Sequence, residues 1–553
     1  MNWKILNQIE SFEKENVVRA ILENRGLKNK KEIEEFLNPI QPNKFSASDL
    51  GIDRKELTKA VKRINRAIEK GESIVVYGDY DADGICATAI LWESLYRLSK
   101  KVLPYIPERV SEGYGLNKKS ISQLKEKDAN LKLLITVDHG ITAAEKIKYA
   151  QGLGIDVIVC DHHQLEEKKP ECQAVVHTDQ VCAAAIAWFL ARGIYQSQKK
   201  ACPNFLDLVA IATIADLEPL LGVNRSLVKY GLQALNKTKR CGLLAIFEEA
   251  GIKPGTIDTY EVGFIIGPRL NAAGRMEHAL ESLRLVCTPK SSQAQALASK
   301  LGLTNQERQV LTEETAKHAR ELLLEQIQGE ELPKLIFVSH ESYQEGVIGL
   351  AASKLTEEFY RPSIVISQGE VYSKASARSI NGFNIIEAIR TQSNLLVDVG
   401  GHPMAAGFTL ETARIEELKK GLALVAEEEI DSGLLERSLK IDLELPLSAL
   451  SLSLWQELAN LKPFGLANPQ PVFKSQAVVK EFRLVGKEGK HLKLVLADAK
   501  EPLVVFGAIA FGRGFLAPQL SLGQKVEVAY SLTLNEWNGQ KNLELKIKDF
   551  RAI

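Results

Sequence analysis

The sequence has no excess charge of either sign and no cysteines at metal-binding spacing. Seventy lysines and arginines balance seventy aspartates and glutamates, so the formal net charge is zero. Any contact with nucleic acid must therefore come from local patches and not from the overall field. The seven cysteines include no C-x-x-C pair, which argues against both a zinc ribbon and a disulfide framework. We expect them to be small buried side chains in a reducing compartment.

Long apolar runs are also missing. The longest, Val181–Ala191, is well short of the ~18 residues that a membrane span needs. The first five residues show no apolar signal core. We therefore expect a cytoplasmic protein that makes no membrane contact.

A chain of 553 residues is too long for one hydrophobic core. Shifts in hydrophobic periodicity predict five parts. These are an N-terminal helical region (1–70), an α/β domain (71–288), a long connecting helix (289–330), a second α/β domain (331–435) and an all-β domain (436–553).

The first α/β domain is predicted from short β-rich runs separated by segments with helical periodicity. Such alternation is typical of βα units and a parallel sheet. The runs are residues 74–77, 102–106, 133–137, 157–160 and 174–176.

The rest of the chain changes character twice. Residues 291–328 show helical periodicity throughout and predict a rigid connector, and a second α/β unit begins at 335–338 and 363–366. Alternating strands without long helices then predict a small barrel of OB-fold size. Its expected strands are 472–479, 492–496, 503–506, 526–533 and 543–547.

Aspartate and histidine residues follow several strands of the first predicted sheet. Asp79, Asp81 and Asp83 come after the first strand, Asp138-His139 after the third, and Asp161-His162-His163 after the fourth, while Asp216 ends a later apolar segment. The carboxyl ends of neighbouring parallel strands line one crevice. We therefore expect these side chains to converge there.

Converging carboxylates repel one another unless divalent cations neutralise them. Carboxylate oxygens mixed with imidazole suit Mn²⁺ or Mg²⁺, and the absence of thiolates argues against zinc. Two such ions about 3.5–4 Å apart would polarise a phosphate ester and activate water. Phosphate-ester hydrolysis is the expected reaction. Plain acidic loops remain the alternative for each motif taken alone.

Four segments together resemble the motifs of the DHH phosphoesterase family. They are Tyr77–Gly84 (YGDYDADG), Val137–Gly140 (VDHG), Asp161–His163 (DHH) and Ala215-Asp216. The resemblance implies metal ligation of two Mn²⁺ or Mg²⁺ ions by Asp81, Asp83, Asp138, His162 and Asp216, with Asp79 holding the ions directly or through another ligand. It implies catalytic roles for Asp81, Asp83 and Asp138, and for His163 at the scissile phosphate or the leaving oxygen. It assigns no role to His139.

Further segments resemble the RecJ exonucleases within this family. Gly400–Gly407 (GGHPMAAG) is similar to the glycine-rich motif of their second, DHHA1 domain, and Ile106–Gly115 and Gly267–Arg275 are similar to their DNA-binding segments. Three positions depart from the usual pattern, namely Gln344, Ala377 and Ala467. The resemblance implies that substrate is bound by Arg109, Arg269, Asn271, Arg275, Ser376, Arg378, Gly400, Gly401 and His402.

The fold that the resemblance implies is a parallel-sheet DHH domain, a long helix, a DHHA1 domain and an OB-fold barrel. The implied activity is 5′-to-3′ hydrolysis of single-stranded DNA in repair and recombination. The implied partners are single-strand-binding protein and a RecQ-type helicase, and the implied state is a monomer. A phosphodiesterase for short oligonucleotides or cyclic dinucleotides is the alternative, although such relatives lack the barrel and the connector. Inorganic pyrophosphatase is disfavoured by Tyr77, and a non-catalytic scaffold by the complete ligand set.

Overall fold

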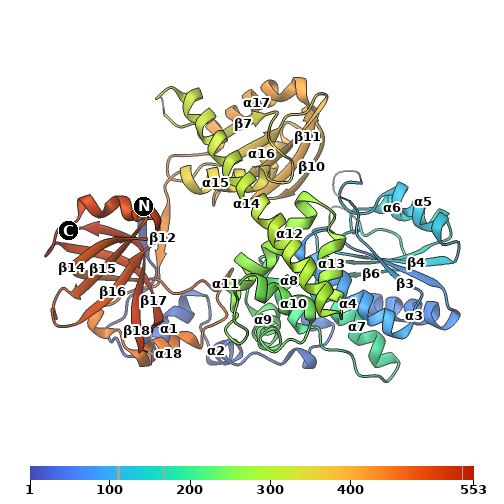
Figure 1. Cartoon of the computed structure of the whole chain (residues 1–553), viewed down its shortest axis with the longest axis horizontal. Helices are drawn as coiled ribbons and strands as arrows, with labels where there is room; N and C mark the ends of the chain where they lie inside the picture. Colours follow the sequence, from blue (N-terminus) through green and yellow to red (C-terminus); the bar gives the residue numbers. More distant parts are fainter. Residues whose placement is uncertain (109–111, 166–167, 330, 538–539) are drawn as a thin grey trace.

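The computed structural model describes residues 1–553 apart from 109–111, 166–167, 330 and 538–539. It contains a first α/β unit, a second α/β unit and a β-barrel, shown at the right, top and left of Figure 1. None of the helices in the described part of the chain combines the length and apolar character that a bilayer crossing requires.

The first sheet has five strands in the order β3-β2-β4-β5-β6, and every pair in it is parallel. Successive residues face opposite sides, so that Val76 and Ile135 join one core whereas Val75 and Leu134 join another. Both faces are covered, as is usual for a parallel sheet. The strands are β2 (Ser73–Tyr77), β3 (Val102–Tyr105), β4 (Leu131–Val137), β5 (Asp156–Asp161) and β6 (Ala174–His177).

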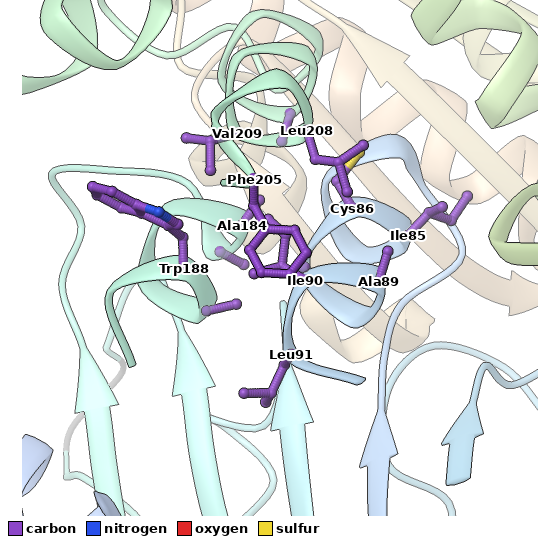
Figure 2. Packing of buried hydrophobic residues seen from close by; sticks show 14 of the residues in the cluster. Ile85, Cys86, Ala89, Ile90, Leu91, Ala184, Trp188, Phe205, Leu208 and Val209 are labelled. Carbon is purple, nitrogen blue, oxygen red and sulfur yellow. The ribbon is translucent and has the colours of Figure 1, made fainter. Parts of the chain in front are cut away.

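Helices cover both faces of this sheet. Figure 2 shows Ile90 of α4, Trp188 of α7 and Phe205, the residue directly before α8, in one buried cluster. Each fully buried large apolar side chain contributes about 1.5–3 kcal/mol, so this cluster fixes the loops at the strand ends. The helices are α3 (Arg54–Lys70), α4 (Ala82–Leu98), α5 (Lys118–Lys127), α6 (Ala144–Gly152), α7 (Ala183–Ser197) and α8 (Leu206–Ala215).

A helical subregion follows and leads into the long helix α14 (Ser291–Ile327). At 1.5 Å per residue α14 is about 55 Å long. Its first part packs into the core of the first unit through Ala294 and Leu301, and its last part packs on the second unit through Ala319 and Leu323. The other elements are α9 (Gly222–Leu235), α10 (Cys241–Glu249), α11 (Thr259–Glu261), the π-helical turn η3 (Val262–Ile266), α12 (Gly267–Met276) and α13 (Leu280–Cys287).

The second unit is a mixed sheet in the order β10-β11-β9-β8-β7, in which only the β7–β8 pair is parallel. Its strands are β7 (Ile336–His340), β8 (Ser363–Ser367), β9 (Tyr372–Arg378), β10 (Leu396–His402) and β11 (Ala405–Glu411). Its helices are α15 (Ile348–Phe359), α16 (Ile385–Arg390) and α17 (Ile415–Glu429).

The C-terminal strands form a barrel that closes because β14 pairs with both β15 and β17. The predicted α/β, connecting-helix and barrel architecture is therefore confirmed. The elements are β12 (Ser438–Ile441), β13 (Leu443–Glu444), α18 (Leu452–Ala459), β14 (Phe473–Val485), β15 (His491–Asp498), β16 (Val505–Ala510), β17 (Lys525–Trp537) and β18 (Gln540–Ala552).

The first 70 residues are divided between two cores. The strand β1 (Asn2–Ile5) pairs with β12, and α1 (Lys14–Asn24) and α2 (Lys30–Leu37) pack in the core of the barrel. Helix α3 belongs instead to the core of the first unit. The N-terminal segment therefore ties the barrel to the first unit.

Candidate metal centre

The candidate site lies at the carboxyl ends of β2, β4 and β5. The loop after β2 enters α4 at Asp81, whose side chain accepts a hydrogen bond from the backbone of Gly84 (2.9 Å) and so caps the helix. Gly78 in this loop has no room for a Cβ because the Thr88 hydroxyl takes its place. The turn is thus held tightly between the strand and the helix.

Asp83 lies in the first turn of α4 and is buried. Its two oxygens accept hydrogen bonds from the backbone N–H groups of Ala183 (2.7 Å) and Ala184 (2.8 Å), at the start of α7. The positive end of that helix stabilises the carboxylate. Burial raises the pKa of Asp83 to about 6, although the charge of His162 opposes the shift.

His162 is the centre of the cluster. Its Nε2 lies 3.2 Å from Asp138 Oδ1 and 3.9 Å from Asp83 Oδ2. Its Nδ1 lies 3.7 Å from Asp216 Oδ2 and 3.5 Å from Glu218 Oε1. Both edges of the imidazole therefore face carboxylates that come from different elements.

Among the residues that the structure describes, three groups of side chains have ligand atoms within 4.8 Å of one another. One group shares His162 with the second and Asp138 with the third, so the three form one continuous cluster. All their donor atoms are carboxylate oxygens or imidazole nitrogens. This donor set fits Mn²⁺ or Mg²⁺. The groups are Asp138-His162-His163, Asp83-His162-Asp216 and Asp79-Asp81-Asp138.

Burial disfavours the charged forms of the carboxyl groups in the cluster, and neighbouring carboxylates repel one another. Burial, together with the charges of Asp81 and Asp83, raises the pKa of Asp138 well above its ordinary value. Burial raises the pKa of Asp216 to about 8. For His162, burial lowers the pKa, but hydrogen bonds to Asp138 and Glu218 outweigh it and raise the pKa to about 12. A divalent cation bound among these carboxylates would relieve their repulsion.

Asp138 adopts a left-handed backbone conformation with φ of 67°. This conformation costs a residue other than glycine about 1–3 kcal/mol and persists only where its surroundings enforce it. The Asp138 N–H donates to the Cys160 carbonyl (3.0 Å), and the Tyr114 hydroxyl donates to the Asp138 carbonyl (3.2 Å). The strain turns this carboxylate toward His162.

His163 is oriented by Asp161. Its Nδ1 lies 2.7 Å from Asp161 Oδ1, and its Nε2 lies 3.2 Å from the Tyr114 hydroxyl. Burial alone would raise the pKa of Asp161, but the hydrogen bond from His163 and backbone N–H groups outweigh it and hold the pKa below its ordinary value. About a third of the His163 side chain is exposed (35%), so a ligand can reach this ring.

His139 packs inside the domain. Its Nε2 lies 3.0 Å from the Tyr77 carbonyl and its ring lies edge-on to the Tyr77 ring. Burial lowers the pKa of His139 to about 4. The side chain is therefore neutral near pH 7 and supports the loop.

The helix α12 brings only some of its predicted residues to the cluster. Asn271 Oδ1 accepts a hydrogen bond from the backbone of Ala82 (2.7 Å), which fixes the loop after β2. Arg269 does not join the cluster, because its Nε donates to Glu249 (2.6 Å) on α10. Arg109 lies outside the described residues.

Arg275, at the end of α12, reaches the second unit. Its Nη1 donates to the carbonyl of Gly346 (3.4 Å), in the loop before α15. The close approach of Gly346 to the Arg275 backbone leaves no room for a Cβ. The two units therefore meet at the end of α12.

Ser376 and Arg378 lie on β9, beside the first turn of α15. Arg378 Nη1 donates to Ser376 Oγ (3.1 Å). A Cβ on Gly349 would lie 2.8 Å from Ser376 Oγ and 3.0 Å from Arg378 Nη2. A guanidinium, a hydroxyl and a helix N-terminus thus lie close together, which is the chemistry of a phosphate site.

The glycine-rich motif lies on β10, where Gly400 pairs with Gly407 and Gly401 with Ala406. Gly401 has φ of 145° and a Cβ there would clash with the backbone of β11. Burial and the charges of His163 and His162 lower the pKa of His402. His402 is therefore close enough to the histidines of the cluster for their charges to act on its pKa.

Glu218 was not predicted as a residue of the site. Asp161 was expected among the strand-end side chains and Tyr114 lies in the segment Ile106–Gly115, but neither was given a role. Glu218 follows Asp216 by two residues. This Asp-x-Glu spacing at the end of an apolar helix could have indicated that Glu218 belongs to the site. The contact of Tyr114 with His163 joins two loops and has no sequence signature.

Comparisons with known proteins match three parts of the chain. The DHH family N-terminal domain matches residues 73–213, the DHHA1 domain 332–428 and the RecJ OB domain 441–549. The single-stranded-DNA-specific exonuclease RecJ of Salmonella typhimurium is 31% identical, over 96% of this chain and 95% of that protein. The chain belongs to the RecJ family. The RecJ of Bacillus subtilis is 33% identical over 99% of this chain and 69% of that protein.

The solved RecJ structures agree with this assignment. The crystal structure of RecJ from Thermus thermophilus in complex with Mn²⁺ superposes with a TM-score of 0.83 at 31% identity, over 100% of this chain and 79% of that one. The same protein in complex with Mg²⁺ gives a TM-score of 0.76 at 29% identity, over 100% of this chain and 78% of that one.

Proposed function

We propose that this RecJ-family chain is a metal-dependent exonuclease that removes nucleotides from the 5′ end of single-stranded DNA, in repair and recombination. The observation that carries the proposal is the convergence of Asp83, Asp138 and Asp216 around His162. With Asp79 and Asp81 these residues would hold two Mn²⁺ or Mg²⁺ ions. Bound there, the ions would neutralise charge on a phosphodiester and activate water.

His163 is suited to moving a proton at the leaving oxygen. Asp161 fixes its Nδ1, so that Nε2 points toward the Tyr114 hydroxyl and the exposed side of the ring. A fixed imidazole beside a cation cluster can donate a proton as the phosphodiester bond breaks. Asp161 and Tyr114 act through His163 as positioning residues.

The second unit supplies side chains that would bind a phosphate of the substrate. Ser376, Arg378 and the first turn of α15 would bind one phosphate, and Arg275 and His402 would contact the strand as well. We also keep Arg109, Gly400 and Gly401 in the proposed substrate site. A 5′-terminal phosphate held by Arg378 would set the direction of digestion, because the chain end is recognised before the bond is cut.

Gly349→Ala is expected to weaken this phosphate site. The added methyl group would displace Ser376 Oγ or Arg378 Nη2, and misplacing one charge-assisted contact costs about 1.5–3 kcal/mol. The KM for 5′-phosphorylated single strands should rise at least about tenfold, with a smaller change in kcat. Gly152→Ala is the matched control, because nothing lies near a Cβ at that helical position. Equal KM values for the two variants would contradict the assignment.

Metal binding is expected to release protons. At pH 7 Asp216, with a pKa of about 8, and His162, with a pKa of about 12, both carry a proton in the metal-free protein. Each must lose it to coordinate an ion. Affinity for Mn²⁺ should therefore rise as the pH increases from 6 to 8. Calorimetric titration at pH 7 in two buffers of different ionisation enthalpy should show about one to two protons released; no release would contradict the expectation.

The proposed activity is tested with 5′-phosphorylated DNA labelled at its first nucleotide. With Mn²⁺, the protein should release labelled mononucleotide from single strands and leave blunt duplex intact, and EDTA should abolish the release. Cleavage of dinucleotides alone would favour the short-oligonucleotide alternative. No hydrolysis of any substrate would contradict the proposal.

Partners and boundaries are further proposals from the same family membership. We infer that the enzyme works as a cytoplasmic monomer, fed by a RecQ-type helicase and by single-strand-binding protein. We propose functional divisions near residues 70, 288, 330 and 435. Gel filtration with light scattering tests the monomer directly.

A further inference from the structure

Two aromatic side chains on the first unit are exposed and stacked on each other. Tyr260 is 59% and Phe264 is 69% exposed. Their ring centroids lie 5.0 Å apart with 28° between the planes. They lie four residues apart on the continuous helical segment formed by α11 and η3, so they share one face. Large apolar rings exposed in this way often mark a binding surface.

The segment that carries these rings leads directly to the metal cluster. It continues without a break into α12, which bears Asn271 and Arg275. At 1.5 Å per residue, Tyr260 lies about 22 Å along the helix from Arg275. A single strand whose end is held at the metal cluster could thus lie along this helix.

The same segment also packs against the end of α8, from which Asp216 emerges. A Cβ on Gly267 would lie 3.4 Å from the Ala215 Cβ, and one on Gly263 would lie 3.8 Å from the Ile214 side chain. Leu217, directly after Asp216, is 71% exposed and has a left-handed backbone with φ of 59°. An exposed apolar side chain thus lies directly after Asp216, at the end of the helix against which the aromatic segment packs.

The opposite end of the segment faces the barrel. Asp258, two residues before Tyr260, pairs with Lys462 (2.7 Å), which lies in the segment between α18 and β14. Lys462 is half exposed (50%) and sits where a backbone phosphate could approach it. In Figure 1, α11 lies on the side of the first unit that faces the barrel.

We propose that Tyr260 and Phe264 form a stacking platform for the bases of single-stranded DNA, several nucleotides behind the scissile bond. The proposal rests on the proposed exonuclease function and adds a site on the path between the barrel and the metal cluster. Aromatic faces accept every base, so such a platform gives affinity without sequence preference. The chain has zero net charge, so its overall field does not attract the strand. Base stacking would therefore account for a larger share of the binding affinity.

The test compares the double variant Tyr260→Ala/Phe264→Ala with Leu424→Ala. Leu424 is a similarly exposed apolar side chain (72%) on α17. Leu424→Ala therefore controls for the loss of an exposed apolar side chain. Binding of 5′-phosphorylated, fluorescently labelled 4-, 8-, 12- and 20-mers is measured by anisotropy in EDTA, where no hydrolysis occurs. Tyr260→Phe is the conservative variant and should bind as the wild type does.

The wild-type dissociation constant should fall as the strand grows long enough to reach the platform. The double variant should lose this gain and bind the 20-mer at least about tenfold more weakly. Unchanged binding of the 20-mer by the double variant would overturn the platform, and the two rings would then merely stabilise their own helix. Wild-type hydrolysis of the 20-mer with Mn²⁺ is measured in parallel, and its absence would overturn the exonuclease function itself.

Discussion

Replacing Asp138 by asparagine is expected to lower kcat/KM on single-stranded DNA at least about a thousandfold. Asp138 belongs to two of the three candidate ligand groups and lies 3.2 Å from His162. Loss of this charge weakens ion binding, and metal ions supply several kcal/mol of charge stabilisation in such reactions. Asparagine keeps the side-chain shape and tolerates the left-handed backbone of this position.

The same substitution should not unfold the protein. It removes one charge from a cluster in which burial and neighbouring carboxylates already disfavour ionised Asp138, so metal-free Tm should stay the same or rise. Asp156→Asn is the control, since Asp156 lies at the opposite end of β5 and pairs with Arg63 (2.6 Å). It should keep wild-type activity. If the kcat/KM of Asp138→Asn stayed within about tenfold of the wild-type value, Asp138 would not be a ligand of the metal centre.

Replacing Arg225 by methionine is expected to detach the barrel from the first unit. Arg225 on α9 is 1% exposed, and its Nε donates to the Phe36 carbonyl (2.7 Å) while its Nη2 donates to the Lys462 carbonyl (2.8 Å). Its guanidinium also lies 3.6 Å from the centre of the Phe36 ring. Burial lowers the pKa of Arg225 to about 10, so the group is still charged at pH 7.

This arginine is the centre of a larger contact. Ser226, Lys229 and Tyr230 on the same helix donate to the carbonyls of residues 40, 37 and 39. Each buried carbonyl left without a donor costs about 1–3 kcal/mol, so Arg225→Met should reduce the free energy of unfolding by about 3 kcal/mol or more. Calorimetry should show the barrel unfolding in a separate, earlier transition.

Two further variants decide whether the donor geometry matters. Arg225→Lys keeps the charge but loses the planar set of donors, so its destabilisation should be intermediate. Arg19→Met removes an exposed arginine whose contact with Glu23 is 3.9 Å long, and such surface pairs contribute about 0–1 kcal/mol. A single transition at the wild-type temperature for Arg225→Met would contradict the role of Arg225 in joining the two parts.

The buried elements of the fold were predictable from sequence. Strands β4 and β5 lie in a parallel sheet covered on both faces, so they read as continuous apolar runs. The long helix was predicted at 291–328 and observed at 291–327, because its apolar spacing is helical throughout. The alternation of apolar and polar residues ends where a strand becomes exposed. The strand predicted over 543–547 is therefore observed as the longer β18, Gln540–Ala552.

Contacts between distant segments were not predictable. The four residues of β1 pair with β12, more than 430 positions away, and nothing local in either segment signals the pairing. The docking of α1 and α2 on the barrel depends on the same long-range packing.

The residues of the site likewise fall into those that the sequence predicts and those that it does not. Strand-end residues such as Asp138 and His162 were predictable, since topology alone brings the ends of parallel strands together. The partner of Arg269 depends on which helices pack together and that of Tyr114 on which loops meet, and no motif encodes either. Ala467 stands where the family usually has glycine, and it adopts a left-handed backbone with φ of 62°; the glycine preference thus has a conformational cause.

The most direct test of the metal centre is anomalous diffraction from crystals grown with Mn²⁺. The account predicts two peaks about 3.5–4 Å apart, both bounded by Asp81, Asp138 and His162, and the loss of at least one peak in Asp138→Asn. Peaks only at other acidic surfaces, or none at the ends of β2, β4 and β5, would contradict it.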